Sequence, residues 1–282
     1  MTMLSINTNV GALKAASASY SVNKSMETSM QRLSTGLRIN SAADDAAGHQ
    51  IANRMTAEIM GLKQAIKNAA DAQALMGTAE GAIEEIQVML LRMRELAVQA
   101  SNATNSTADK ASLQLEAAEL ETEIQRTANN TTWAGKVLLN GTFSGDEDSA
   151  GRTFQIGTDS GQTIELSIPE LTATAVTIGY SVALSIGSFT GAQSAIVTID
   201  DGMSTLANVR ANIAAKMNRL DHTIANLENV VTNLSQSKGR IVDADFATET
   251  ANLARTQVLQ QASMAMLAQA NASKQNILTL FQ

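Results

Sequence analysis

Small or apolar residues recur about every 3.5 positions between Ile51 and Ala100. This heptad period is typical of helices that wind around one another in a left-handed supercoil. No proline interrupts the stretch, and glycines within it such as Gly61 and Gly77 weaken a helix without ending it. A helix of about 75 Å cannot bury its apolar stripe alone, so other parts of the chain must cover it. The stripe, in which Gln73 is the one polar member, comprises Ile51, Met55, Ile59, Leu62, Ile66, Ala69, Gln73, Met76, Ala79, Ile83, Ile86, Leu90, Met93, Ala97 and Ala100.

The composition favours helix–helix packing over a globular core around a cleft. Hydrophobic residues make up 44% of the 282 positions, which is enough for a sizeable core, but aromatic residues make up only 3% and a single proline is present. The net charge of −7 argues against nucleic acid or an anionic membrane surface as a partner. Cysteine is absent, which excludes disulfides, thiolate metal sites and a thiol nucleophile.

The first residues do not resemble a secretory signal, because they lack a basic region and Asn7, Thr8 and Asn9 interrupt any apolar segment. No apolar run approaches the roughly 18 residues of a membrane-spanning helix, so we expect no membrane insertion. These features predict a cytoplasmic protein or one exported without a cleaved signal.

A weaker helical pattern runs from about Asn7 to Leu33 and should end near Gly36. Because it is thinned by serine and alanine, an isolated helix of this kind is marginal in water. A polar connector follows, in which Ser41 is expected to cap the long helix, with Asp44 and Asp45 in its first turn.

Three further helices are expected after the long one, at about Ala108–Ala128, from Ser204 to a break at Gly239, and at about Ala244–Leu280. The short polar turn before Ala108 makes the first of these an antiparallel neighbour of the long helix. The last is rich in alanine and glutamine, like the first helix of the chain.

Short β structure is expected at about 143–200. Alternating residues predict a hairpin formed by Thr153–Ile156 and Thr163–Ile168. Thr174–Ile178, Ser181–Ile186 and Ala195–Ile199 are further strand candidates. The expected fold is therefore mainly α: a long antiparallel helical coiled-coil rod formed by the N- and C-terminal halves, with a small central β-hairpin region.

No pattern of residues indicates catalysis, a cofactor or a metal site. The two histidines, His49 and His222, do not belong to an HExxH motif. Asp243-Ala-Asp245 resembles the start of a calcium loop but lacks its glycine and closing glutamate, so it is better interpreted as the cap of the last helix.

Several segments at both ends of the chain resemble bacterial flagellins. They are Ser5–Asn9, Leu33–Gly48, Ile51–Arg54, Thr78–Gly81 and Arg92–Gln99 in the N-terminal half, and Arg219–Leu227, Arg240–Glu249, Leu259–Ala262, Met266–Asn271 and Gln275–Leu278 in the C-terminal half. The resemblance implies an inner coiled-coil domain made of residues 1–42 and 239–282, and a helical rod domain of residues 43–238. Large outer domains are missing.

The resemblance also implies a function and partners. Such a protein is a secreted, extracellular homopolymer subunit that adds head-to-tail to a helical filament for swimming motility. Its terminal helices fold only when neighbouring subunits bury them. The family's partners are the flagellar cap and hook-associated proteins, an export chaperone and the type III export apparatus. The expected polymer seam consists of Leu4, Val10, Leu13, Met30, Leu33, Leu259, Met266, Ile277 and Leu280.

Arg92–Gln99 is similar to the segment that the vertebrate Toll-like receptor for flagellin recognises, and Glu116 matches its partner position on the next helix. Arg92, Leu96, Gln99 and Glu116 are therefore candidate receptor contacts. The simpler interpretation is a solvated helix face with local ion pairs of little energetic weight.

Three other functions remain as alternatives. A hook–filament junction protein shares the terminal helices, but the intact Arg92–Gln99 and Arg240–Glu249 segments favour a flagellin. A secreted enzyme on the same frame lacks a recognisable site. A coiled-coil adaptor would stay oligomeric in the cytoplasm.

Overall fold

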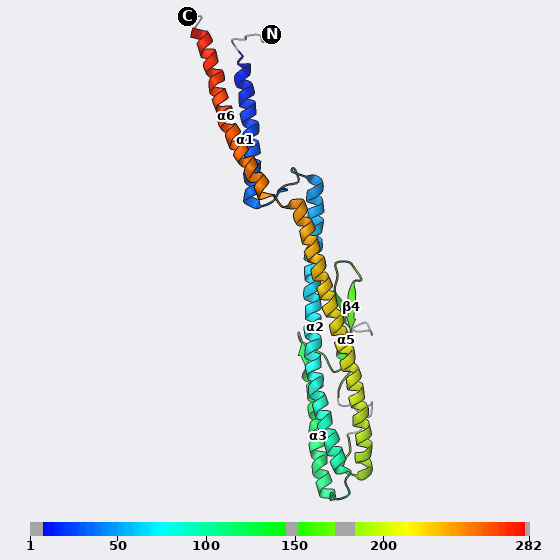
Figure 1. Ribbon diagram of the computed structural model, residues 1–282. Coiled ribbons are helices and arrows are strands. Elements are labelled where there is room, and N and C mark those ends of the chain that lie inside the picture. Colours follow the sequence, from blue (N-terminus) through cyan, green and yellow to red (C-terminus); the bar gives the residue numbers. More distant parts are fainter. Residues whose placement is uncertain (1–7, 145–151, 173–183, 280–282) are drawn as a thin grey trace. The chain divides into compact units, whose positions relative to one another are not determined.

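A computed structural model describes residues 8–144, 152–172 and 184–279, without the side chains of 144 and 274–279. The described part is mainly helical (Figure 1), with α1 at Val10–Thr35, α2 at Ala46–Ala100, α3 at Thr107–Asn130, α5 at Phe189–Val242 and α6 at Phe246–Thr279. The chain forms two compact units. The terminal unit comprises Met1–Ile59 and Thr232–Gln282, and the central unit comprises Met60–Val231, so their limits lie within α2 and α5.

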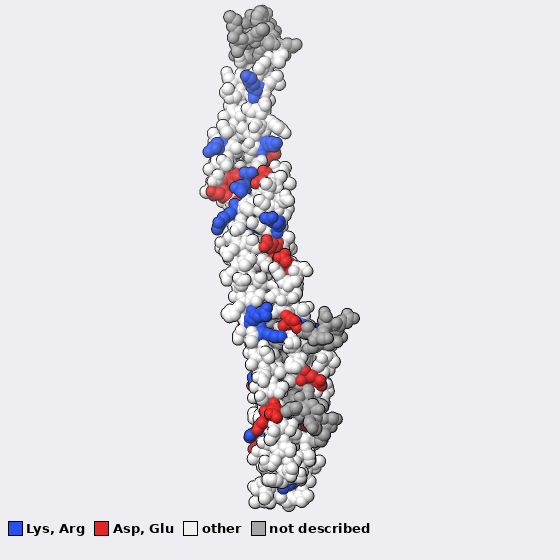
Figure 2. All heavy atoms as spheres, turned by 90° about the vertical axis from the view of Figure 1, so that its right-hand side faces the viewer, with Lys and Arg blue, Asp and Glu red and all other residues white. Residues whose placement is uncertain are grey.

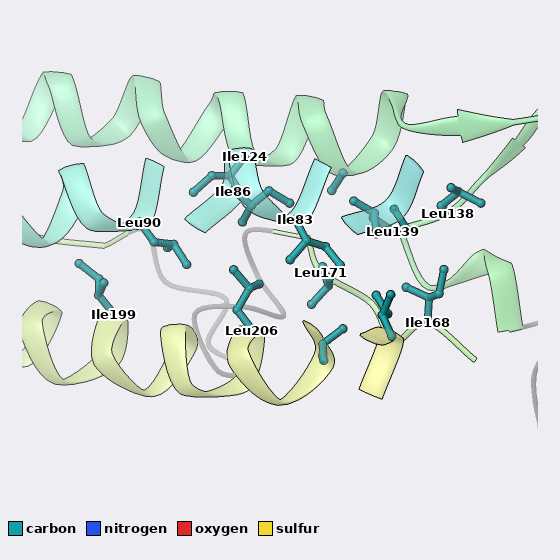
Figure 3. Packing of buried hydrophobic residues seen from close by; sticks show 14 of the residues in the cluster. Ile83, Ile86, Leu90, Ile124, Leu138, Leu139, Ile168, Leu171, Ile199 and Leu206 are labelled. Carbon is teal, nitrogen blue, oxygen red and sulfur yellow. The ribbon is translucent and has the colours of Figure 1, made fainter. Parts of the chain in front are cut away.

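The heptad stripe of α2 forms the spine of the core in the central unit. From Met76 to Ala100 every stripe residue is fully buried, whereas Ile51 at the other end is exposed. Figure 3 shows Ile83, Ile86 and Leu90 pointing toward side chains of α3, α5 and the connecting segments. The prediction that other helices cover the long helix is confirmed for this unit.

α3 begins with a reciprocal cap that fixes its first turn. The hydroxyl of Ser106 accepts a hydrogen bond from the Asp109 amide, and the Asp109 carboxylate accepts from the Ser106 amide at 2.9 Å. The Ser106 hydroxyl also donates to the Asp109 carboxylate at 2.7 Å, and this hydrogen bond, followed by the one from the Ser106 amide, lowers the pKa of Asp109. The helix predicted at about Ala108–Ala128 is therefore confirmed, and α3 is slightly longer than predicted.

The predicted β-hairpin is confirmed. β3, at Arg152–Gln155, pairs antiparallel with β4, at Thr163–Leu166, and alternate residues of β4 face the core. Its turn approaches α2 so closely that a Cβ atom added to Gly61 would lie 2.7 Å from Thr158 Cγ2. The glycine that weakens the helix therefore provides space for the hairpin.

A second, smaller hairpin was not predicted. β1, at Thr132–Trp133, pairs with β2, at Lys136–Val137. The two turn residues, Ala134 and Gly135, both have positive φ, as a type I′ turn requires. A short 3₁₀ helix, η1 at Thr142–Ser144, follows.

Three predictions about the region of α5 are wrong. Ala195–Ile199 is not a strand, because it lies inside α5, which begins at Phe189 and not at Ser204. Gly239 does not break this helix, which continues to Val242. The buried positions explain the early start, since Ala192, Ala195, Ile199, Gly202, Leu206 and Val209 recur at helical spacing. Thr174–Ile178 and the first half of Ser181–Ile186 lie outside the described residues, and positions 184–186 are irregular.

The cap of α2 also differs from the prediction. Asp45, and not Ser41, accepts a hydrogen bond from the Gly48 amide, at 2.9 Å. Asp44 instead closes the preceding turn, where it accepts hydrogen bonds from the Ser41 amide and hydroxyl, and these lower its pKa. Both aspartates precede the first residue of the helix.

A ladder of polar contacts joins α2 and α5 within the central unit. Arg94 forms an ion pair with Asp200 at 2.6 Å, and Gln73 donates a hydrogen bond to Asp221 at 2.7 Å. Between these two, Arg210 contacts both Glu80 and Gln87. This polar ladder fixes the antiparallel register that the sequence pattern predicted without specifying.

Candidate assembly surface

α1 and α6 lie side by side in the terminal unit, as an antiparallel pair with almost no apolar core (Figure 1). In α1, whose side chains are all described, Ser29 is the only buried residue. The buried side chains described in α6 are Glu249 and Thr256. Full burial in the described part of this pair is therefore confined to polar residues, and its apolar side chains are half-buried or exposed.

The residues of the expected polymer seam follow this pattern. Val10, Leu13, Met30, Leu259 and Met266 are exposed, with Leu13 and Met266 reaching 62% and 66%. Leu33 is half-buried. Leu4 and Leu280 lie outside the described residues, as does the side chain of Ile277. Exposed apolar groups at this density are typical of a surface that another protein covers.

A groove of about 570 Å³ runs between the two helices and is lined mainly by small and apolar side chains. We call it the terminal groove. It brings Leu259 and Met266 together, whereas Val10, Leu13 and Met30 do not line it. Its lining residues are Gly11, Lys14, Ala15, Ala18, Leu259, Ala262, Ser263, Met266, Gln269, Ala270 and Ser273.

Polar contacts, which the sequence did not predict, set the register of α1 against α6. Asn9 caps α1 with its side-chain oxygen, which accepts from the Ala12 amide, and its amide nitrogen donates to the Ala270 carbonyl at 3.1 Å. Farther along, Gln260 donates to Asn23 at 2.8 Å. The only sequence signal for such contacts is a polar residue on an otherwise apolar helical stripe.

The strongest of these contacts involves the buried carboxylate of Glu249. It accepts hydrogen bonds from the Ser29 hydroxyl and from Arg32, each at 2.9 Å. The hydrogen bond from Arg32 is the main cause that lowers the pKa of Glu249, against the opposing effect of burial. Glu249 is therefore charged at neutral pH and ties the two helices together.

The connectors next to α1 and α6 also pair with each other. The Arg38 amide donates to the Val242 carbonyl at 2.6 Å, and the Ala244 amide donates to the Gly36 carbonyl at 2.9 Å. Gly36 ends α1 with a φ of 71°, in the left-handed region that glycine adopts at low cost. Asp245 caps α6 by accepting from the Ala247 amide, so the interpretation of Asp243-Ala-Asp245 as a cap is confirmed.

The candidate receptor residues in the central unit are only partly brought together on the surface. Arg92 on α2 pairs with Glu116 on α3 at 2.7 Å and with Glu95 at 2.6 Å, and these acceptors raise its pKa further. Gln99 is exposed on α2. Leu96 has no exposed surface, so the expectation that it joins this face is wrong: its side chain packs in the core.

Charged side chains on the face drawn in Figure 2 form small groups of mixed sign. Within residues 8–144, 152–172 and 184–279, no cluster of three or more potential metal ligands occurs. None of the helices in this part of the chain combines the length and the apolar character needed to cross a membrane.

Comparison with known proteins identifies similar sequences along almost the whole chain. The bacterial flagellin N-terminal helical region matches residues 6–144, and the flagellin C-terminal helical region matches residues 196–281. The flagellin of Halalkalibacterium halodurans is 41% identical over 278 residues, which cover 98% of this chain and 99% of that protein. Bacillus subtilis flagellin is 38% identical over 304 residues, with the same coverage.

A solved structure shares the fold at low sequence identity. It is that of a Vibrio parahaemolyticus protein assigned as flagellar hook-associated, and it covers 71% of this chain and all of that chain, with a TM-score of 0.60. At 16% identity this likeness concerns the fold alone.

Proposed function

Because the chain belongs to the bacterial flagellin family, we infer that it is a structural subunit of the flagellar filament. The observation that carries this function is the similarity to flagellins over nearly the full length of both partners. A local motif could be shared with other proteins, but end-to-end similarity extends to both terminal helices and to the core between them. A hook–filament junction protein remains the alternative function, and these relatives do not favour it.

Folding of the terminal helices is coupled to subunit addition in this proposal. The α1/α6 pair buries Ser29, Glu249 and Thr256 and leaves many of its apolar side chains exposed. Two such helices gain little hydrophobic stabilisation from each other, so they depend on neighbours that cover the exposed side chains. Head-to-tail addition, which does not close on itself, would supply those neighbours along a helical filament.

Export and capping partners are part of the proposal. The subunit would pass through the type III export apparatus with the help of a chaperone, and would add to an extracellular filament between the hook-associated and cap proteins. A chain without cysteine cannot be trapped by disulfides during such a passage.

We also propose that the Arg92–Glu116 pair contributes to recognition by the vertebrate Toll-like receptor. Arg92, Glu116 and Gln99 are accessible in the described chain, and an exposed guanidinium can form bidentate hydrogen bonds with a carboxylate of a partner. Leu96 is buried, so it could contribute only indirectly, through the core contacts that hold α2 in place.

Seeded polymerisation at neutral pH tests the filament function. The full chain should form long filaments by electron microscopy and light scattering, whereas a variant without residues 1–30 and 255–282 should stay monomeric. The truncated variant removes most of α1 and α6 but retains the core residues around Ile86. If the full chain formed only small closed oligomers, the junction-protein alternative would be the better account.

A further inference from the structure

Met266 is a highly exposed methionine that lines the terminal groove. It lies on α6 opposite the small residues Gly11, Ala15 and Ala18 of α1, and 66% of its surface is accessible. Thioethers fill irregular apolar gaps well because they are flexible and polarizable. A helix of a second copy that packed into this groove would therefore bury the sulfur atom.

We propose that Met266 is an oxidation site that controls assembly: peroxide converts its thioether to the sulfoxide before assembly and prevents the subunit from joining a filament. This inference rests on the proposed filament function, because the groove must be covered by a neighbouring subunit. The chain contains no cysteine, so no thiol of its own competes for the oxidant.

The reaction is a two-electron oxygen transfer from hydrogen peroxide. The sulfur lone pair of Met266 attacks one peroxide oxygen, an S–O bond forms and the O–O bond breaks. The departing hydroxide takes the proton of the transferred oxygen and leaves as water. The product carries a polar, chiral sulfoxide in place of an apolar group.

The effect on assembly follows from the lining of the groove. A sulfoxide oxygen is well solvated in the free subunit, but addition would bury it among the side chains of Leu259, Ala262 and their neighbours. Addition would then cost more free energy, whereas a subunit already in the filament is protected because its sulfur is covered. Oxidation should therefore act on free subunits and not on finished filaments.

Met60 provides an internal comparison. It is 67% exposed, practically as accessible as Met266, but it lies on α2 at the start of the central unit and does not line the groove. Peroxide should oxidise both residues at similar rates. Only the sulfoxide at 266 should change assembly.

The experiment uses two full-length variants. In the first, Met30 and Met264 are replaced by leucine, so that Met60 and Met266 are the only methionines more than half exposed among the described residues. The second adds Met266→Leu. Leucine and methionine have similar volumes, so both variants should fold. Each is treated with hydrogen peroxide, quenched with free methionine, checked for sulfoxide by mass spectrometry and added to filament seeds.

We expect the critical concentration of the first variant to rise about tenfold after oxidation, and that of the second to stay unchanged. Methionine sulfoxide reductase should restore the first variant. An oxidised first variant that assembles at its original concentration would refute the inference while leaving the filament function intact. Absence of sulfoxide at residue 266 would refute it too. If the untreated full chain did not polymerise, the filament function itself would fail, and the inference with it.

Discussion

The two helical regions of this chain use a similar period for different purposes. In the central unit, α2 turns its stripe toward α3 and α5 and buries large residues such as Ile83, Ile86 and Leu90 completely. In the terminal unit, α1 and α6 bury only polar side chains and expose Leu13 and Met266. Helical periodicity therefore indicates where a helix is apolar, but not whether its own chain covers it. The first arrangement favours a monomer that folds alone, and the second favours an oligomer.

The largest effect that separates the two regions should come from the central core. Ile86→Ala removes a fully buried side chain and should lower the free energy of unfolding by about 2–5 kcal/mol. Val88→Ala, two residues away but exposed, should change it by less than about 0.5 kcal/mol. Denaturant unfolding of the full-length monomer, followed by circular dichroism, measures both. Equal effects would mean that the central unit is not an independent core.

In the terminal unit, the contact whose loss should destabilise the helix pair most is the polar one at Glu249. Glu249→Gln removes the charge that Arg32 and Ser29 contact and should destabilise the α1/α6 pair by about 1–3 kcal/mol. Glu27→Gln removes the same charge from an exposed position of α1 and serves as the control. The dissociation temperature of filaments should fall only for the first variant, and the monomer core should be unaffected by either. A fall in monomer stability would contradict this separation.

The same carboxylate predicts a dependence on pH. Its pKa in the folded state is lowered, so its stabilising contribution is present above the ordinary glutamate pKa of about 4.3 and is lost as the pH falls through the lowered value. Wild-type filaments should become less heat-stable in this acidic range. Glu249→Gln filaments should lose less stability over the same range, and parallel curves for both proteins would argue against Glu249 as the responsible group.

Two glycines distinguish the connector from the helix interior. Gly36→Ala places a Cβ in open space, 4.0 Å from the Phe246 ring, so its cost of about 1–2 kcal/mol should come from the left-handed backbone alone. Gly81→Ala, in the middle of α2 with nothing within 4 Å, should stabilise its helix by about 0.5–1 kcal/mol. Filament and monomer melting, measured in parallel, should show opposite signs for the two substitutions.

The smallest effect is expected at the exposed ion pair. Arg92→Ala should leave the stability of the monomer almost unchanged, because solvent screens its contacts with Glu95 and Glu116. Receptor activation by the free subunit, measured in a reporter cell line, should fall strongly even though the subunit stays folded. Unchanged activation would leave the pair with only its weak structural role.

The sequence predicted the long helix, α3 and the β3–β4 hairpin because each has a strong local pattern. It failed at Ala195–Ile199, where branched residues favour a strand locally but the partner helix requires α5 to begin earlier. It could not predict that Glu249 meets Ser29 and Arg32, since these residues lie more than two hundred positions apart. It also placed Leu96 on a recognition face, because the motif does not reveal which side of α2 faces the core.

The polar ladder between α2 and α5 carries information that the apolar stripe lacks. A stripe that repeats every seven residues looks the same after a slip of one heptad. Such a slip in one direction would place Asp221 near Glu80 and Arg210 near Arg94, two contacts between like charges. A slip in the other direction would move Asp221 toward Ile66 and separate Arg94 from Asp200. The ladder thus acts as a positional code, in which the order of charges along two helices permits one alignment and penalises both of its neighbours.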